Sequence, residues 1–109
     1  MIDFTTAQKE DLDAIAWHFD EERVLFRAAE ELGEASVAAL QYIRARKGDG
    51  FGTVRRDAFI GELADACVMI EQLLILHPEW KELIERTADS KIARTLDRYD
   101  ITEPDDAQD

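Results

Sequence analysis

Two pairs of acidic residues have the types and spacing to do chemistry. They are Glu31 with Glu34 and Glu62 with Asp65, each spaced i,i+3 in a segment with helical hydrophobic spacing. On a helix such residues share a face, with Cβ atoms about 5–6 Å apart. Four carboxylates gathered at the edge of a core repel one another unless a cation lies among them. Oxygen ligands of this kind suit Mg²⁺, which also binds substrate phosphates.

The two acidic pairs also have an interpretation that involves no metal. The chain has 25 acidic residues among 109, so i,i+3 pairs also arise by chance on solvated helix faces. Both pairs border apolar stripes, which favours a position at the edge of a core. The stripe residues are Leu25, Ala28, Ala29, Leu32 and Ala35 in the first segment and Ile60, Leu63, Ala64 and Cys67 in the second.

A group of basic residues lies further along the chain. Lys91, Arg94 and Arg98 occupy positions i, i+3 and i+7 and therefore share a helix face. A cationic face suits a polyphosphate, because guanidinium groups bind phosphate oxygens in pairs. The alternative is that these cations simply offset the dipole at a helix C-terminus.

Other motifs are weaker. The loop predicted over residues 47–56 contains Gly48, Gly50 and Gly52, but no Lys-Ser/Thr follows it and no strand precedes it, so it is not a phosphate-binding P-loop. We interpret it as a connector, with a lid as the alternative. The two histidines lack metal-ligand spacing, and the single cysteine, Cys67, is expected to be a small core residue.

Composition limits the classes of function. A length of 109 residues, 46% hydrophobic content and only five Gly and two Pro predict one helical domain. A net charge of −12 speaks against binding a nucleic acid polymer. No segment has the roughly 20 apolar residues that span a membrane, and the first residues do not resemble a signal peptide. We therefore expect a cytoplasmic protein without a membrane partner.

The hydrophobic spacing predicts an all-α fold with four helices and no strands. The helices are expected over residues 5–17, 21–46, 57–77 and 78–99, with a Thr5–Gln8 capping box at the first and Pro78 in the first turn of the last. Residues 1–101 form a single domain in this interpretation, and residues 102–109 form a disordered acidic tail. The buried side of the third helix is expected to comprise Phe59, Ile60, Leu63, Cys67, Ile70, Leu73 and Leu74. Gly33 indicates a close helix approach, ligand access or a tolerated helical glycine.

The ordered set of motifs resembles the MazG-like, all-α nucleoside triphosphate pyrophosphohydrolases. AAEELGEA (28–35) is similar to their EExxE signature and GELADACVMIEQL (61–73) to their ExxD signature. HFDEERVLFRAAEE (18–31) and SKIARTLDRY (90–99) resemble the segments that precede and follow these signatures in small members. The resemblance covers residues 18–99.

The resemblance implies a four-helix MazG-like bundle that is completed by homo-oligomerisation into a dimer or tetramer. It implies that Glu31, Glu34, Glu62 and Asp65 coordinate Mg²⁺ or Mn²⁺. The enzyme would cleave a nucleoside triphosphate between its α- and β-phosphates, releasing a monophosphate and pyrophosphate, in nucleotide-pool control or house-cleaning. The metals would polarise the phosphate and help to ionise a bound water. Glu30 would orient that water or accept its proton, and the basic residues Lys91, Arg94 and Arg98 would bind phosphate oxygens.

The chain departs from the small members it resembles in one place, and it also differs from a related enzyme class. Residues 20–23 are Asp-Glu-Glu-Arg where small members often carry a glycine and a glutamine, so the base specificity does not transfer. The residues after Asp65 lack the DLxYH-type sequence of phosphoribosyl-ATP pyrophosphohydrolases, which makes that alternative less favoured. A second alternative is a non-catalytic helical oligomerisation or regulatory module, whose stability would not depend on Mg²⁺.

Overall fold

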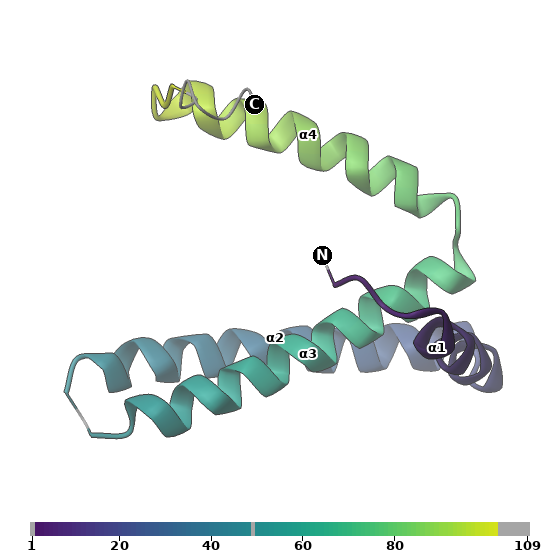
Figure 1. Ribbon diagram of the computed structural model, residues 1–109, viewed down its shortest axis with the longest axis horizontal. Coiled ribbons are helices and arrows are strands. Elements are labelled where there is room, and N and C mark those ends of the chain that lie inside the picture. The colour runs from purple at the N-terminus through teal and green to yellow at the C-terminus, as the bar shows by residue number, and fades with distance from the viewer. Residues whose placement is uncertain (1, 49, 103–109) are drawn as a thin grey trace. The chain divides into compact units, whose positions relative to one another are not determined.

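The computed structural model describes residues 2–48 and 50–102 of the chain (Figure 1). It contains four helices: α1 (Thr6–His18), α2 (Glu21–Arg46), α3 (Gly52–Leu76) and α4 (Trp80–Arg98). No described residue lies in a strand, so the prediction of an all-helical chain is confirmed. Nearly all of the predicted tail lies outside the described residues.

The chain forms two compact units, Met1–His77 and Pro78–Asp109, and each is described by itself. The first unit contains α1, α2 and α3, and the second contains α4. No helix of the described chain is both long and apolar enough to cross a membrane.

Side-chain caps fix the starts of α1 and α2. The predicted capping box is present: the backbone N–H of Gln8 donates to Thr5 Oγ1 at 3.1 Å, and that of Thr5 donates to Gln8 Oε1 at 2.9 Å. At α2 the N–H of Arg23 donates to Asp20 Oδ1 at 2.8 Å. Each cap satisfies backbone donors that the first helical turn leaves unpaired. The sequence therefore sets both helix starts locally.

α2 and α3 lie side by side as an antiparallel hairpin (Figure 1). The buried positions on their facing sides are mostly small: Ala28, Ala35, Ala38 and Ala45 on α2 and Ala66 on α3. Larger side chains join them at one end, where Val24, Ala28 and Met69 form a cluster with Leu73 and Leu76. Small facing residues let two helices approach closely, which brings side chains from α2 within reach of those from α3.

α3 begins five residues earlier than the sequence predicted. We expected a loop as far as residue 56, but the helix starts at Gly52. Contacts with α2 explain the difference, since Arg55 Nη1 donates to Gln41 Oε1 at 3.1 Å and the ring of Phe59 stacks on Tyr42 with centroids 6.2 Å apart. The connection before α3 contains Gly48 and Gly50 at φ 118° and 83°, a backbone region that favours glycine.

The buried side of α3 was also partly mispredicted. Ile60 and Leu63 are 55% and 44% exposed, whereas Ala66, Met69 and Gln72 are buried. The sequence shows a continuous apolar stripe, but the neighbouring helices pack on the face about 100° away from it. The other five residues of the predicted stripe, Cys67 among them, are half-buried.

α1 packs against α3 and buries Leu12 and Ala16. The start of α2 is joined to the end of α3 by Glu21 Oε1 and His77 Nε2, which lie 2.9 Å apart. These contacts hold the first unit together at the open end of the hairpin.

α4 begins at Trp80 and not at Pro78, which lies in a turn before it. The turn is closed by the N–H of Lys81, which donates to the carbonyl of Pro78 at 3.3 Å. Within its own unit α4 has no fully buried residue. Whether α4 completes a MazG-like bundle remains a prediction.

Candidate metal centre

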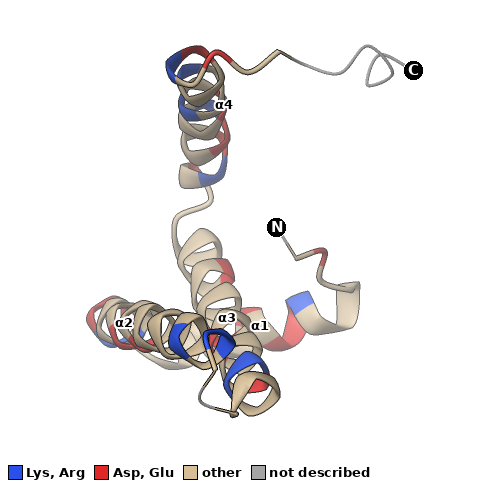
Figure 2. Cartoon of the chain, turned by 90° about the vertical axis from the view of Figure 1, so that its left-hand side faces the viewer, with Lys and Arg blue, Asp and Glu red and all other residues tan. Residues whose placement is uncertain are grey.

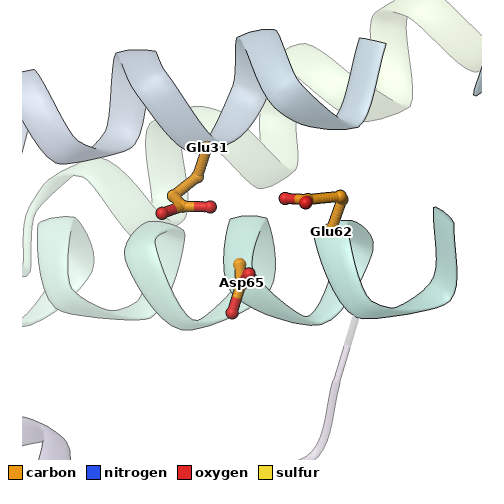
Figure 3. A group of neighbouring side chains, drawn as sticks. All are labelled: Glu31, Glu62 and Asp65. Carbon is orange, nitrogen blue, oxygen red and sulfur yellow. The ribbon is translucent and has the colours of Figure 1, made fainter. Parts of the chain in front are cut away.

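Three carboxylates meet where α2 faces α3. Glu31 comes from α2, and Glu62 and Asp65 come from neighbouring turns of α3 (Figure 3). One oxygen of each side chain lies within 4.8 Å of the others. Opposite ligands of a divalent ion with metal–oxygen distances of about 2.0–2.6 Å are about 4–5 Å apart. The three oxygens therefore have a separation that one cation can bridge.

Two oxygens of this cluster are buried without a partner. Glu31 is 8% exposed and Glu62 is half-buried. Glu31 Oε2 and Glu62 Oε2 have no hydrogen-bond partner among the described residues. A buried carboxylate oxygen without a partner is costly, because it loses hydration and gains nothing in return. The site needs a cation or a proton to offset this cost.

The positive charge of Arg27 does not neutralise the three carboxylates. Arg27 Nη2 lies 3.3 Å from Glu31 Oε1, one turn earlier on α2. The Arg27 side chain is 53% exposed, so solvent screens much of its charge. Arg27 contacts the other oxygen of Glu31, and Oε2 remains free to bind another group.

The electrostatics of Glu31 reflect this imbalance. Burial raises the pKa of the Glu31 carboxyl above its ordinary value of 4.5, and the charges of Glu34 and then Asp65 raise it further. Arg27 opposes these effects and lowers the pKa. Without a cation, Glu31 therefore loses its proton at a higher pH than an ordinary glutamate does. A bound divalent ion would reverse this tendency by favouring the charged form.

The structure brings together three of the four predicted ligands. Glu34 is exposed and is not one of the three residues whose oxygens meet, although it is close enough to raise the pKa of Glu31. The predicted catalytic residue Glu30 directly precedes Glu31 on α2 and is exposed. It lines a surface pocket with Asp20, Glu22, Arg23, Phe26 and Arg27.

A second cavity lies between α1 and the hairpin, and sequence reasoning missed it. Its volume is about 130 Å³, and it is lined by Ile15, Phe19, Arg23, Val24, Arg27, Met69 and Gln72. Arg23 lies over the Phe19 ring, 5.1 Å from its centroid. The i,i+4 spacing of Arg23, Arg27 and Glu31 was the available signal, since it places two guanidinium groups on the helix edge that carries the first ligand.

The predicted phosphate-binding residues lie on α4, in the second unit. Lys91, Arg94 and Arg98 are exposed, and their spacing places them on one side of the helix. Figure 2 shows acidic and basic residues interspersed along α4. The structure does not relate this face to the carboxylate cluster.

Comparison with protein-family models, with curated proteins and with solved structures gave no match.

Proposed function

We propose that this protein is a divalent-cation-dependent nucleoside triphosphate pyrophosphohydrolase that releases a nucleoside monophosphate and pyrophosphate. The observation that carries the proposal is the pair of buried, partnerless oxygens, Glu31 Oε2 and Glu62 Oε2, beside Asp65. The motif resemblance to MazG-like enzymes supplies the reaction, and this geometry supplies a reason for the motif residues to be there.

The residues that would hold the cation are Glu31, Glu62 and Asp65, with Glu34 at the margin of the site. Their all-oxygen donor set suits Mg²⁺ or Mn²⁺. When bound, such an ion acts as a Lewis acid on phosphate oxygens and lowers the pKa of its water.

The chain's own residues have separable roles in this proposal. Glu30 is exposed beside Glu31 and would orient the attacking water or accept its proton. Arg23 and Arg27, which line the neighbouring cavity, offer guanidinium groups for a substrate phosphate or base. The proposal also retains phosphate binding by Lys91, Arg94 and Arg98, which rests on their charge and shared face.

Homo-oligomerisation, as a dimer or tetramer, belongs to the same proposal. In the first unit many large apolar side chains are exposed, including Leu25, Leu32, Ile60 and Leu63. A chain with such surfaces gains stability by burying them against a partner.

The experiment is a pyrophosphate-release screen over canonical and modified nucleoside triphosphates, with Mg²⁺ or Mn²⁺ present. Glu62→Gln and Asp65→Asn should lower kcat/KM by on the order of 10²–10³-fold. Glu71→Gln is the matched control, because Glu71 lies nine positions after Glu62 and therefore on the opposite side of α3. If both ligand variants hydrolyse as well as the parent, the site assignment is wrong. If no substrate yields pyrophosphate, the enzyme proposal is wrong and the protein is a non-catalytic helical module.

A further inference from the structure

Gln72 places a buried amide in the wall of the cavity between α1 and the hairpin. The residue is 5% exposed, and its amide nitrogen donates to Met69 Sδ at 3.6 Å. A thioether sulfur is a weak acceptor, so this bond returns little of the hydration that the amide has lost on burial. The amide therefore gains more from a ligand in the cavity that offers it a stronger acceptor and a donor.

Apart from Gln72 and two arginines, the wall of the cavity is apolar. Ile15 of α1, Val24 of α2 and Met69 of α3 contribute to it, together with Phe19. An apolar wall with a few polar groups that fix orientation is typical of a small-molecule site. The volume of the cavity is about 130 Å³, slightly less than the 150 Å³ or so of an apolar cavity that holds benzene. The cavity therefore has room for a single six-membered ring, and a fused two-ring system does not fit within it.

The cavity lies next to the carboxylate cluster along both helices. On α2, Arg27 lines the cavity, and its Nη2 lies 3.3 Å from Glu31 Oε1. On α3, Gln72 follows Asp65 by seven positions, which places the two residues on one face and about 10 Å apart along the helix axis. The 5′-phosphate of a nucleotide and the far edge of its base are separated by a comparable distance. A phosphate at the cluster and a base at Gln72 can therefore belong to one molecule.

The cavity also adjoins the surface pocket that contains Glu30. Arg23 and Arg27 line both the cavity and this pocket, so the two spaces share these side chains as a wall. A ligand that fills the cavity with its ring has the pocket available for its sugar. Its phosphate would then lie near Glu30 and the carboxylate cluster, as the proposed reaction requires.

We infer that this cavity binds the base of the substrate and accepts pyrimidines in preference to purines, an inference that rests on the proposed pyrophosphohydrolase function. Uracil and cytosine are single six-membered rings, and each presents a donor and an acceptor side by side. The Gln72 amide carries one donor group and one acceptor, so it can pair with either base by turning its amide over. A purine has two fused rings and exceeds the volume of the cavity. Gln72 is thus a specificity-determining residue, and the substrates are pyrimidine nucleoside triphosphates.

The test is calorimetric titration of the full chain with nucleoside monophosphates, first in EDTA and then with Mg²⁺. Monophosphates carry the base but cannot release pyrophosphate, so the result does not depend on turnover. We expect UMP and CMP to bind more tightly than AMP and GMP by about 10-fold or more, the discrimination that the size of a pocket provides. Ribose 5-phosphate, which lacks a base, should bind more weakly than UMP.

Two variants separate the amide from the size of the cavity. Gln72→Met removes the amide but keeps the length of the side chain, so it should weaken UMP binding by about 10-fold and leave ribose 5-phosphate binding unchanged. Gln41→Met is the matched control, because Gln41 contacts Arg55 and does not line the cavity. Ile15→Ala enlarges the cavity at a residue that is already 42% exposed, and it should narrow the difference in affinity between UMP and AMP.

Equal binding of UMP and AMP by the parent would overturn the inference, as would equal UMP affinities of Gln72→Met and Gln41→Met. The proposed hydrolysis would be unaffected, because the pyrophosphate-release screen tests it separately. If no monophosphate binds in either condition, the cavity holds only water and the inference is wrong. Selective UMP binding by a chain that releases no pyrophosphate would support the cavity assignment and reject the enzyme. If Gln72→Met does not fold, the selectivity of the parent and of Ile15→Ala still decides.

Discussion

Glu31 on α2 and Glu62 on α3 reach toward each other across the hairpin, and each has one buried carboxylate oxygen without a hydrogen-bond partner among the described residues (Figure 3). Two like charges held in this way destabilise the folded chain unless a third group offsets them. The alanine-lined contact between the helices makes the approach close, so the cluster is a consequence of packing as well as of charge.

The effect of Glu31→Gln on the melting temperature should depend on whether a divalent cation is present. In EDTA the variant removes a buried charge and should melt at the same temperature as the parent or a few degrees higher. With Mn²⁺ at about 100 times its Kd, the parent should gain about 2.7 kcal/mol, a rise in Tm on the order of 10 °C. Because the variant has lost a ligand, it should lose most of this rise. A variant that melts well below the parent in EDTA would show that Glu31 stabilises the fold without a metal.

The raised pKa of Glu31 predicts a pH dependence of stability. Between pH 4.5 and the raised pKa, the folded chain binds more protons than the unfolded chain. The contribution of Glu31 to stability therefore falls as the pH rises through this window. The difference in Tm between Glu31→Gln and the parent in EDTA should grow with pH across it. If the difference in Tm is constant from about pH 4 to about pH 8, the pKa of Glu31 is not raised in the folded chain.

The basic face of α4 should affect substrate binding if it contacts phosphates. Arg94→Gln should raise KM by roughly 10-fold, since a charge-assisted hydrogen bond contributes about 1.5–3 kcal/mol. Lys81→Gln, which removes a charge about 140° around α4 from Arg94, is the control. Equal KM values for the two variants would mean that the face only offsets the helix dipole.

The sequence predicts a helix start correctly where neighbouring residues in the chain form its cap. The capping residues Thr5 and Asp20 fix α1 and α2, and both starts were predicted correctly. The start of α3 was not, because it depends on Arg55 and Phe59 packing against α2, which no local signal records. The buried side of α3 was missed for a related reason. Hydrophobic spacing shows that Leu63 and Cys67 form a stripe, but not whether that stripe faces its own chain or a partner.

The sequence predicted which residues belong to the candidate site, but not how their side chains lie relative to one another. The i,i+3 pairs identified Glu31, Glu62 and Asp65, which the hairpin brings together. Spacing could not show that the oxygens of Glu34 would lie outside the group of three. The cavity lined by Arg23 and Gln72 depends on how α1 packs on α3, which the sequence does not record. Whether any of these residues binds a metal remains a prediction.

Gly33 provides a test of the helix itself. A Cβ atom at this position would contact nothing within 4 Å, so close helix packing does not require glycine here. Gly33→Ala should therefore stabilise the chain by roughly 1 kcal/mol through helix propensity alone. The measurement is urea-induced unfolding followed by circular dichroism. A loss of stability would indicate that Gly33 contacts a partner, and a loss of activity alone would indicate that it gives access to a ligand.

Calorimetric titration of Mn²⁺ tests the central claim most directly, since it requires neither a substrate nor turnover. The account predicts that the parent and Glu71→Gln bind Mn²⁺ with equal affinity, and that Glu62→Gln and Asp65→Asn bind it more weakly by about 10-fold or more. If the parent binds no Mn²⁺, or if all four proteins bind it equally, the carboxylate cluster is not a metal centre.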